Sequence, residues 1–378
     1  MRAPTPSTSG DISNVGVTFD ACLTLASTTV RDVGELPKTM PAAVLHGAGR
    51  VEIEEVPVPA VGRNDVLVAV DLCGICGSDL HMVLEGWGAP GSWQGHEWIG
   101  TVTAVGDGVT AWQPGDVVVG GPTVRCGTCA MCVVGRPSLC VGRDTPGTGL
   151  EQGAFASFKR SPADQLLPMP DGLDARSAAL AEPLAVALHG IGQGRVEPGQ
   201  RVLVLGAGPI GALSIAALRA MGVEDVTCAE PAPSRQALAT AVGATRVLDP
   251  ADLVVPSVAE PGLIVDDAVD VVLECSGKRR AMEAGLAQLV RGGTLVLVGA
   301  GIEPPRFDPN RILLNELVVT GSYEYAGDGF ESALSLLASG TLPIDDLLEP
   351  DVVPLDGLLE AMRALAEGRL AGKVLVKP

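Results

Sequence analysis

One stretch decides the fold of this chain of 378 residues: Arg201-Val202-Leu203-Val204-Leu205-Gly206-Ala207-Gly208-Pro209-Ile210-Gly211. It begins as an apolar run typical of a buried strand, and its ending, Gly-x-Gly-x-x-Gly, opens a helix. The first glycine permits a tight turn, the second the close approach of a ligand, and the third helix–strand packing. Backbone N–H groups at the helix start attract a pyrophosphate. We therefore predict a dinucleotide site made by Gly206, Gly208, Pro209, Ile210 and Gly211.

Strands and helices alternate from Gln200 onward, which is typical of a parallel sheet covered by helices on both faces. Apolar runs predict six strands, at 201–205, 225–229, 245–248, 270–274, 294–298 and 317–320, with helices over 210–221, 234–242 and 279–290. Six is the number of strands in a complete doubly wound dinucleotide domain. The connection before Asp270 is irregular, with two prolines, and receives no assignment. We assign residues 191–329 to a Rossmann domain.

Glu230 follows the second predicted strand, nineteen residues after Gly211. A carboxylate at this place can bind the ribose hydroxyls of NAD, and it repels the 2′-phosphate of NADP. Arg235 lies five residues further along and could sit beside the ribose, which leaves NADP open. An ordinary turn followed by a solvated acid is the alternative explanation. We predict NAD as the cofactor, with Glu230 and Arg235 near its ribose.

The first half of the chain has short predicted strands broken by glycine and proline, which favours a β-rich, barrel-like unit. Examples are 42–45, 66–70, 100–105 and 117–119, followed by a helical stretch over 174–192. The tail, 330–378, holds one or two helices and a final strand at 373–376. Residues 1–39 are rich in Ser, Thr and Pro and are predicted to form a flexible extension, so that Met40 could be the true start.

The composition limits the class of function. Lysine and arginine number 26 against 45 acidic residues, and the formal charge of −19 argues against nucleic acid as a partner. No apolar run approaches the ~20 residues of a membrane helix, and the start resembles neither a secretory signal nor a transit peptide. Nine cysteines, several at metal-like spacing, favour a reducing compartment. We predict a cytoplasmic protein without membrane or nucleic-acid partners.

Four of the cysteines, Cys126, Cys129, Cys132 and Cys140, fall within fifteen residues. Four thiolates at this spacing can surround one tetrahedral Zn²⁺. Because they fill all four positions, such a site supports structure and leaves no position for a substrate. An iron–sulfur cluster, paired disulfides and unrelated buried thiols are the alternatives. We predict a structural zinc site and expect the chemistry elsewhere.

Three other segments could supply a second metal site. The segment 73–81 contains Cys73, Cys76 and His81, the segment 95–100 contains His96 and Glu97, and the segment 181–184 contains Glu182. A thiolate, an imidazole and a carboxylate give zinc three ligands and leave one position open, as a Lewis-acid catalyst requires. Each residue alone has a simpler explanation, such as a buried thiol, a surface histidine or a charge at the start of a helix. Two of the four histidines, His81 and His96, nevertheless fall within these segments.

The chain resembles the zinc-dependent medium-chain dehydrogenases/reductases from residue 40 to residue 378. The run Gly95-His96-Glu97-x-x-Gly100-x5-Gly106-x-x-Val109 matches the zinc signature of that family, and the cysteine cluster and glycine-rich turn fall where the family has them. The resemblance implies an α/β fold: a GroES-like β-barrel catalytic domain (40–190 and 330–378) carrying the structural zinc lobe, plus the doubly wound Rossmann domain. It also implies a cleft between the domains for cofactor and substrate, and a dimer or tetramer.

The family assigns roles to the matching residues. Cys76 and His96 match ligands of the catalytic zinc, and Glu97 matches the acid beside it, which ligates zinc in some members. Alcohol dehydrogenases of the liver type have a cysteine as third ligand. This chain instead has Glu182 in a Glu-Pro-Leu-Ala-Val segment, similar to sorbitol, butanediol and glucose dehydrogenases.

Three more matches concern protons and orientation. Ser78 matches the hydroxyl that touches the substrate oxygen, His81 the histidine that passes its proton outward, and Asp79 the acid that orients the histidine ligand. In this family zinc lowers the pKa of the substrate hydroxyl, and hydride passes to the nicotinamide. The resemblance therefore implies two zinc ions, one catalytic and one structural, with NAD as the hydride carrier.

The expected substrate is a secondary alcohol, diol, polyol, sugar or cyclitol. Sorbitol dehydrogenases carry an arginine where Glu324 falls, which argues against a simple sorbitol assignment. Aromatic residues of the expected pocket loops (Trp87, Trp93, Tyr323 and Tyr325) could equally serve packing. Two alternatives stay open: an L-threonine or amino-alcohol dehydrogenase on the same scaffold, and a zinc-binding module without enzymatic activity.

Overall fold

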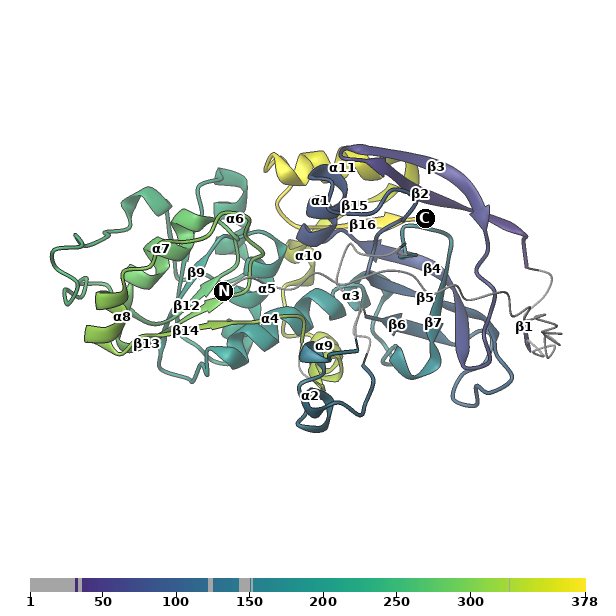
Figure 1. The fold of residues 1–378 in the computed structure, drawn as a ribbon, viewed down its shortest axis with the longest axis horizontal. Helices are drawn as coiled ribbons and strands as arrows, with labels where there is room; N and C mark the ends of the chain where they lie inside the picture. Colours follow the sequence, from purple (N-terminus) through teal and green to yellow (C-terminus); the bar gives the residue numbers. More distant parts are fainter. Residues whose placement is uncertain (1–30, 33–35, 122–124, 143–149, 151, 326) are drawn as a thin grey trace, which may run out of the picture.

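The computed structural model describes residues 31–32, 36–121, 125–142, 150, 152–325 and 327–378. The chain forms two parts that lie side by side (Figure 1). One part is built on a six-stranded sheet, and the other on an eight-stranded sheet with a separate two-stranded hairpin. None of the helices within the described ranges combines the length and apolar character that crossing a membrane requires.

Six parallel strands form the first sheet, in the order β11-β10-β9-β12-β13-β14. They are β9 (Arg201–Leu205), β10 (Asp225–Ala229), β11 (Arg246–Leu248), β12 (Val269–Glu274), β13 (Leu289–Leu297) and β14 (Val318–Gly321). The connecting helices include α5 (Pro209–Ala220), α6 (Pro233–Ala241), α7 (Arg279–Ala287) and α8 (Pro309–Asn315). This is the doubly wound order, with the first strand at the centre, and it confirms the predicted Rossmann fold.

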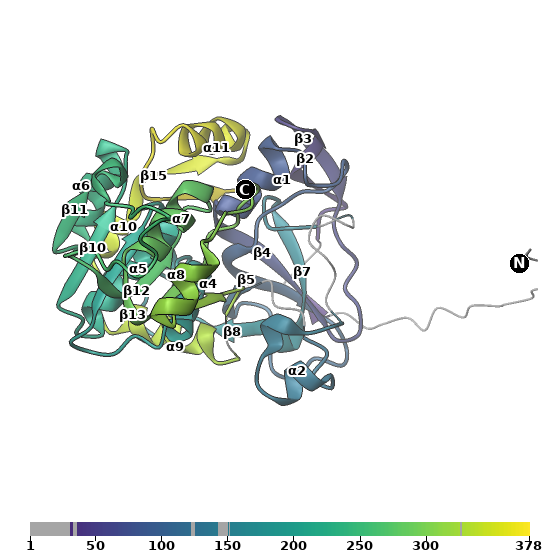
Figure 2. The same ribbon diagram turned by 60° about the vertical axis from the view of Figure 1, so that its left-hand side comes forward.

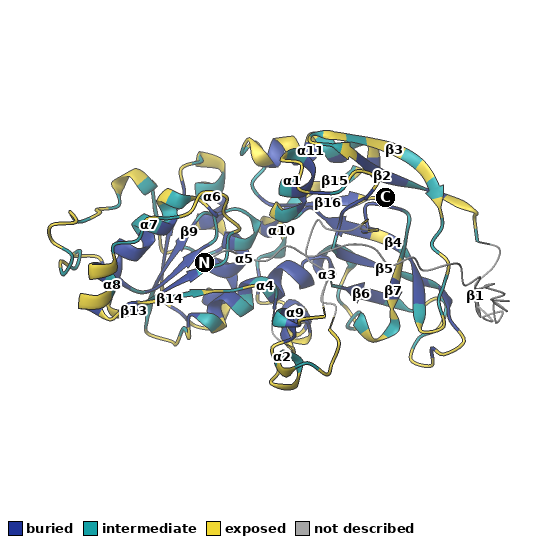
Figure 3. Cartoon of the chain, viewed as in Figure 1, coloured by how far each residue is buried: buried dark blue, intermediate teal, exposed yellow. Residues whose placement is uncertain are grey.

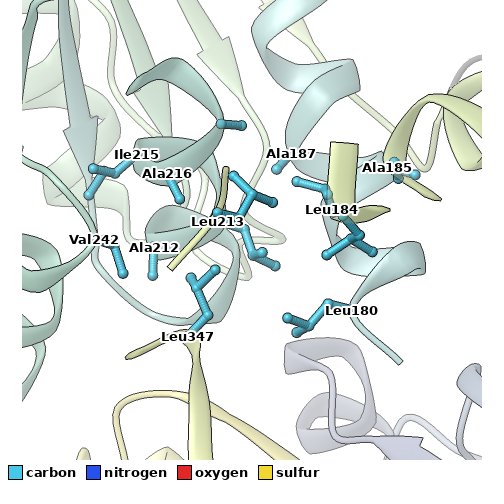
Figure 4. Close-up of a cluster of buried hydrophobic side chains, with 14 of the residues drawn as sticks. Leu180, Leu184, Ala185, Ala187, Ala212, Leu213, Ile215, Ala216, Val242 and Leu347 are labelled. Carbon is cyan, nitrogen blue, oxygen red and sulfur yellow. The ribbon is translucent and has the colours of Figure 1, made fainter. Parts of the chain in front are cut away.

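Side chains of β9 enter two different cores because successive residues of a strand point to opposite faces. Val202 and Val204 pack with residues of α5 and α4 (Ala181–Gln193), whereas Leu203 and Leu205 pack with residues of α7 and β13. Figure 4 shows the first core, where Leu184 of α4 and Leu213 of α5 lie together. The central strands β9 and β12 are therefore largely buried (Figure 3), as their mainly apolar sequences require.

The eight-stranded sheet joins segments from both ends of the chain. Its main path runs β15-β16-β4-β5-β6-β8, with β7 paired to β4 and β1 paired to β5. The strands are β1 (Arg31–Asp32), β4 (Asp65–Gly74), β5 (Glu97–Val105), β6 (Val117–Gly120), β7 (Phe158–Pro162), β8 (Leu166–Pro168), β15 (Leu348–Pro354) and β16 (Lys373–Lys377). In Figures 1 and 2 the yellow C-terminal elements lie beside the purple-blue N-terminal ones. All strands of the six-stranded sheet lie between residues 191 and 329, and all strands of the eight-stranded sheet lie before residue 190 or after residue 330. The domain boundaries at 190/191 and 329/330 stay predictions.

The predicted flexible extension, residues 1–39, lies mostly outside the described residues. Within it, β1 pairs antiparallel with β5, with Arg31 opposite Val105. The hairpin strand β2 (Thr39–Gly47), which pairs with β3 (Arg50–Pro57), also begins before Met40. Backbone pairing thus reaches upstream of Met40, and a strand of two residues has no periodicity from which it could be predicted.

The predicted helical stretch at 174–192 is two helices, α3 (Ala175–Ala178) and α4. Asp174 caps α3 by accepting a 3.0 Å hydrogen bond from the Ser177 backbone N–H. A proline inside a helix clashes with the carbonyl four residues earlier, which for Pro183 is that of Ala179. The break falls there, and Pro183 occupies the first turn of α4, where proline is tolerated.

The remaining helices surround the eight-stranded sheet and the junction between the two parts. They are α1 (Gly77–Leu84), α2 (Ala130–Val133), α9 (Gly329–Ala338), α10 (Ile344–Leu347) and α11 (Leu358–Ala366). The α9 helix packs against α4, and α11 packs against α1. The α2 helix belongs to the four-cysteine segment, which projects from the body of the molecule (Figure 2).

Candidate active site and metal centres

The four clustered cysteines (126, 129, 132 and 140) form a lobe around α2 and bring their sulfur atoms within 4.8 Å of one another. The Cys129 and Cys140 sulfurs are 4.0 Å apart, close to the spacing of about 3.8 Å expected around one zinc with four sulfur ligands. Backbone N–H groups of Cys129 and Gly142 donate to the Cys126 and Cys140 sulfurs at 3.3 and 3.4 Å. The cysteines are free thiols, and this arrangement fits a closed zinc site.

The acidities of these thiols favour a cation at their centre. Hydrogen bonds from the backbone of Thr128 and Cys129 lower the pKa of Cys126 to about 6. Burial among the neighbouring sulfurs instead raises the pKa of Cys132 to about 12. The four groups therefore do not all ionise near neutral pH by themselves, and a bound Zn²⁺ would supply the charge that stabilises four thiolates.

A second group of ligand atoms comes from Cys76, His96 and Glu97, which also lie within 4.8 Å of one another. Cys76 is the residue before α1, and His96 and Glu97 lie at the start of β5, the neighbour of β4. Cys76 is half-buried, and Glu97 is fully buried. A thiolate, an imidazole and a carboxylate are suitable zinc ligands, and three of them leave a fourth position open.

Asp79 orients this group from behind. Its carboxylate accepts hydrogen bonds from the backbone N–H groups of Cys76, at 2.9 Å, and Gly95, at 3.3 Å. The same carboxylate lies 3.6 Å from Nδ1 of His96, which leaves Nε2 to face the metal position. Burial disfavours the charged imidazolium, yet Asp79 and the Cys76 sulfur raise the pKa of His96 well above its usual value. A metal ion would have to displace that proton.

Glu182, the third ligand predicted from the sequence, is not among the residues whose ligand atoms meet within 4.8 Å. It lies buried in the first turn of α4, where burial raises the pKa of its carboxyl to about 8. His96 opposes this rise in pKa and Glu97 adds to it, so the carboxyl is electrostatically linked to the group. In the structure the carboxylate beside Cys76 and His96 is that of Glu97, because β5 carries it next to the histidine.

Lys373 is a residue of this site that sequence reasoning missed. It is 1% exposed on β16, and its Nζ lies 2.6 Å from each carboxylate oxygen of Glu97. Its third hydrogen bond goes to the carbonyl of Ile75, at 3.0 Å. Although burial opposes the charged ammonium, Glu97 raises the pKa of Lys373, which is therefore cationic. Nothing in the run Gly372-Lys373-Val374 marks this lysine as buried.

Gly74 makes room for the Glu97 carboxylate. The two residues are opposite each other on β4 and β5, and a Cβ atom at position 74 would lie only 2.2 Å from Oε2 of Glu97. No real side chain tolerates that distance. The strand therefore has glycine where the carboxylate crosses it, and this space is what places Glu97 beside both Cys76 and Lys373.

The two residues predicted to move the proton lie on α1. Ser78 Oγ is 3.5 Å from Nε2 of His96, at the edge of the ligand group. His81 lies one turn further along; its Nδ1 is 2.8 Å from Oε2 of Glu85, and its ring stacks on Trp87 with centroids 4.9 Å apart. His81 is thus half-buried and points toward the surface, in the direction expected for a group that exchanges protons with solvent.

The glycine-rich turn has the predicted form between β9 and α5. Gly206 has φ = +90°, a conformation that favours glycine. No atom lies within 4 Å of where a Cβ of Gly208 would be, whereas a Cβ of Gly211 would lie 1.9 Å from the carbonyl of Gly206. Pro209 is the first residue of α5 and Ile210 the second. The turn therefore offers open space at Gly208 and the N-terminus of a helix, which suit a pyrophosphate.

Glu230 lies at the end of β10 and is buried beside this turn. One carboxylate oxygen accepts from the backbone N–H of Ala207, at 2.8 Å, and the other from that of Ala232, at 2.9 Å. Arg235 does not face this carboxylate. Its Nη2 donates to the carbonyl of Leu365, at 2.8 Å, so the guanidinium is held by the end of α11.

The aromatic residues of the expected pocket separate into two groups. Trp93 is buried in a core with Met40 and Val44, and Tyr325 is buried edge-to-face with Phe330. Trp87 is 46% exposed next to His81. Packing therefore explains Trp93 and Tyr325, whereas Trp87 and Tyr323, which is 40% exposed, lie at the surface.

Comparison with known proteins places the chain in a family. Residues 62–171 match the alcohol dehydrogenase GroES-like domain, and residues 209–339 match the zinc-binding dehydrogenase domain. Sorbitol dehydrogenase of Bacillus subtilis (strain 168) is 33% identical over 354 residues, which cover 91% of this chain and 98% of the relative. The chain therefore belongs to the zinc-dependent medium-chain dehydrogenases/reductases, in their polyol-dehydrogenase branch.

Solved structures agree with this placement. The 2R,3R-butanediol dehydrogenase of Bacillus subtilis superposes with a TM-score of 0.78 at 32% identity, covering 90% of this chain and 99% of that one. A zinc-binding dehydrogenase of Sinorhizobium meliloti 1021 bound to NADP superposes with a TM-score of 0.79 at 32% identity, covering 90% and 100%. These findings confirm the predicted fold and an oxidoreductase that uses zinc and NAD(P), and they favour neither alternative function.

Proposed function

We propose that this protein oxidises a secondary hydroxyl group of a diol, polyol, sugar or cyclitol and transfers the hydride to NAD. The observation that carries the proposal is the group Cys76, His96 and Glu97, whose ligand atoms lie within 4.8 Å of one another. With one zinc bound, this group would supply three ligands and leave a fourth position for a substrate oxygen. The relatives named for sorbitol and 2R,3R-butanediol support a substrate with neighbouring hydroxyl groups.

Bound zinc would polarise the substrate oxygen and lower its pKa, and the nicotinamide would accept the hydride. Around that chemistry the residues of this chain have separate roles. Ser78, 3.5 Å from His96 Nε2, is placed to receive the hydroxyl proton, and His81 is placed to pass it toward solvent. Asp79 fixes the orientation of His96. Glu182 remains a candidate ligand or a buried acid that adjusts the charge of the site.

The preference for NAD over NADP is part of the proposal. Glu230 is fixed by the N–H groups of Ala207 and Ala232, and a carboxylate held there repels a 2′-phosphate. Arg235 donates a hydrogen bond to the carbonyl of Leu365, which holds its guanidinium at the end of α11. We expect Glu230→Ala to raise KM for NAD about tenfold or more and to narrow the preference over NADP. Glu260→Ala, an exposed change in the same part, is the control.

The deciding experiment follows NADH formation by the zinc-loaded protein with diols, polyols, sugars, cyclitols and amino alcohols. Turnover of diols or polyols, lost in Cys76→Ser, supports the proposal. Activity with L-threonine or other amino alcohols and none with diols would instead establish the alternative dehydrogenase. Absence of any NAD or NADP reduction by protein holding two zinc ions would contradict the proposal.

Two further properties are proposed with it. A cytoplasmic location is supported by the eight cysteines of the described part, all free thiols. A dimer or tetramer is supported by β14, the last strand of its sheet, where Val318 is 48% exposed next to the exposed Leu313 and Leu314 of α8. Sedimentation of the purified protein tests the second property.

A further inference from the structure

A fully buried ion pair links the C-terminal strand β16 to the second metal centre. Lys373 is 1% exposed and Glu97 is completely buried. The ammonium group donates to both oxygens of Glu97 and to the carbonyl of Ile75, so its three N–H donors are all used. Glu97 is at the same time one of three residues whose ligand atoms converge for a metal. With a metal bound, this one carboxylate would therefore have two cations available to it.

The backbone keeps Glu97 in this shared position. Gly74 lies between Glu97 on β5 and Leu375 on β16, because it is opposite both of them in the sheet. The absence of a side chain at Gly74 provides the space for Oε2 of Glu97. Three adjacent strands, β5, β4 and β16, thus carry Glu97, Gly74 and Lys373.

The charges around the pair show what the lysine does. The acidic groups that interact electrostatically with Lys373 are Glu97, Cys76 and Glu182, and His96 belongs to the same ligand group as Cys76 and Glu97. An ammonium ion in this place attracts electron density from the ligand carboxylate and repels a nearby divalent cation. In a buried site such interactions are weakly screened.

We infer that Lys373 is a positioning residue that shares Glu97 with the catalytic zinc and so weakens this ligand, which keeps the ion exchangeable. The inference rests on the proposed function only in placing zinc at the Cys76, His96 and Glu97 group. Without the ammonium, Glu97 would give its full charge to the metal, and the metal would be the only cation able to compensate it. Zinc should then be held more tightly.

The test measures zinc release from the intact, zinc-loaded protein to a coloured chelator. In Lys373→Met, the release of the second-centre zinc should slow about tenfold or more, while release from the four-cysteine lobe stays unchanged and serves as an internal reference. Lys377→Met, an exposed lysine on the same strand, should leave both rates unchanged. With Co²⁺ in place of zinc, the visible absorption bands of the second centre should shift in Lys373→Met only.

A purely structural role for Lys373 predicts a different pattern. It would lower thermal stability equally with and without metal and leave the release rate unchanged, which would overturn the inference. Faster release would overturn it as well. In a Glu97→Gln background, Lys373→Met should no longer slow release, because the shared charge is gone; an equal slowing there would also contradict it.

Two arrangements keep the outcomes separate. If Lys373→Met does not fold, Lys373→Gln, which keeps a neutral donor for Glu97, replaces it with the same expected direction of change. If the unmodified protein binds one zinc only, the proposed function fails whatever Lys373 does. If it binds two and the release rates of the lysine variants equal that of the unmodified protein, the inference alone fails.

Discussion

The two proposed metal centres of this chain are built in opposite ways. The lobe takes four sulfur ligands from fifteen consecutive residues, with Cys126 exposed and backbone N–H groups as neighbours of the sulfurs. The second centre would take its ligands from Cys76 before α1 and from the start of β5, and β16 adds a buried lysine from 276 residues further along. A local site can hold its metal independently, whereas an assembled site depends on the whole eight-stranded sheet.

The difference follows from what each centre has to do. A closed site needs only ligands of the right type at the right spacing, which a short loop provides. A site that keeps one position open must orient three unlike ligands and balance their charges, and this takes buried neighbours such as Asp79 and Lys373. Breaking each centre in turn shows whether the division between structure and chemistry is correct.

The largest effect is expected for Cys76→Ser. Zinc content should fall from two ions per chain to one, and the dehydrogenase rate should fall by about 1000-fold or more, because Lewis-acid stabilisation contributes several kcal/mol. Elemental analysis and initial rates check this. Cys73→Ser is the matched control, since Cys73 is a buried thiol three residues away outside the ligand group. Unchanged metal content in Cys76→Ser would contradict the proposed second metal centre.

Asp79→Asn tests the buried support of the second centre. The amide keeps the shape of the side chain but loses the charge that faces His96. We expect activity or zinc affinity to fall about 10- to 100-fold, the range typical of groups that orient a metal ligand. Asp71→Asn, an exposed change on β4, should have little effect. An equal effect of both variants would show that Asp79 acts only through general stability.

Cys132→Ser tests the lobe. The protein should lose the lobe zinc, keep the second zinc and keep most of its activity at low temperature, because the lobe contributes no group to the catalytic chemistry. The lobe should unfold locally and become the first site of proteolytic cleavage. Limited proteolysis with mass analysis checks this. Loss of both metals together would show that the two centres are not independent.

The smallest effect is expected for Thr128→Val. It removes one hydrogen bond, from the Thr128 hydroxyl to the Cys126 sulfur at 3.6 Å, in an exposed position. A single exposed bond contributes at most about 1 kcal/mol, so chelator extraction of the lobe zinc should accelerate less than about fivefold. If Thr128→Val accelerated zinc loss from the lobe more than Asp79→Asn accelerates zinc loss from the second centre, the lobe would be the centre that depends more on its neighbouring groups.

Local pattern was sufficient to predict most of the fold. The strand–glycine–helix run at 201–211 and the apolar strands after it predicted the six-stranded sheet, because a strand buried on both faces has a distinctive sequence. The lobe was also predictable, because its four cysteines lie close together in the sequence at a spacing that suits one metal ion. The division at Ala179 between α3 and α4 and the short strand β1 were not predicted. The first depends on the clash of Pro183 with the carbonyl of Ala179, and a strand of two residues has no periodicity to read.

The second centre was only partly predictable. Cys76 and His96 were found because they lie in short motifs, and the structure brings them together. Lys373 was missed because its partner is 276 residues away and only the pairing of β16 with β4 joins them. The place of Arg235 beside the ribose stays a prediction. Its hydrogen bond to Leu365 was not predicted, because spacing along a helix does not tell which neighbouring element a side chain will contact.

The position of Lys373 on the last strand also affects how the protein is made. Translation adds about 5–20 residues per second, so the 276 residues that separate Glu97 from Lys373 correspond to about 14–55 s on the ribosome. The four cysteines of the lobe emerge within about 1–3 s of one another at the same rate. The nascent chain can therefore acquire its first metal long before the buried glutamate has received its ammonium partner.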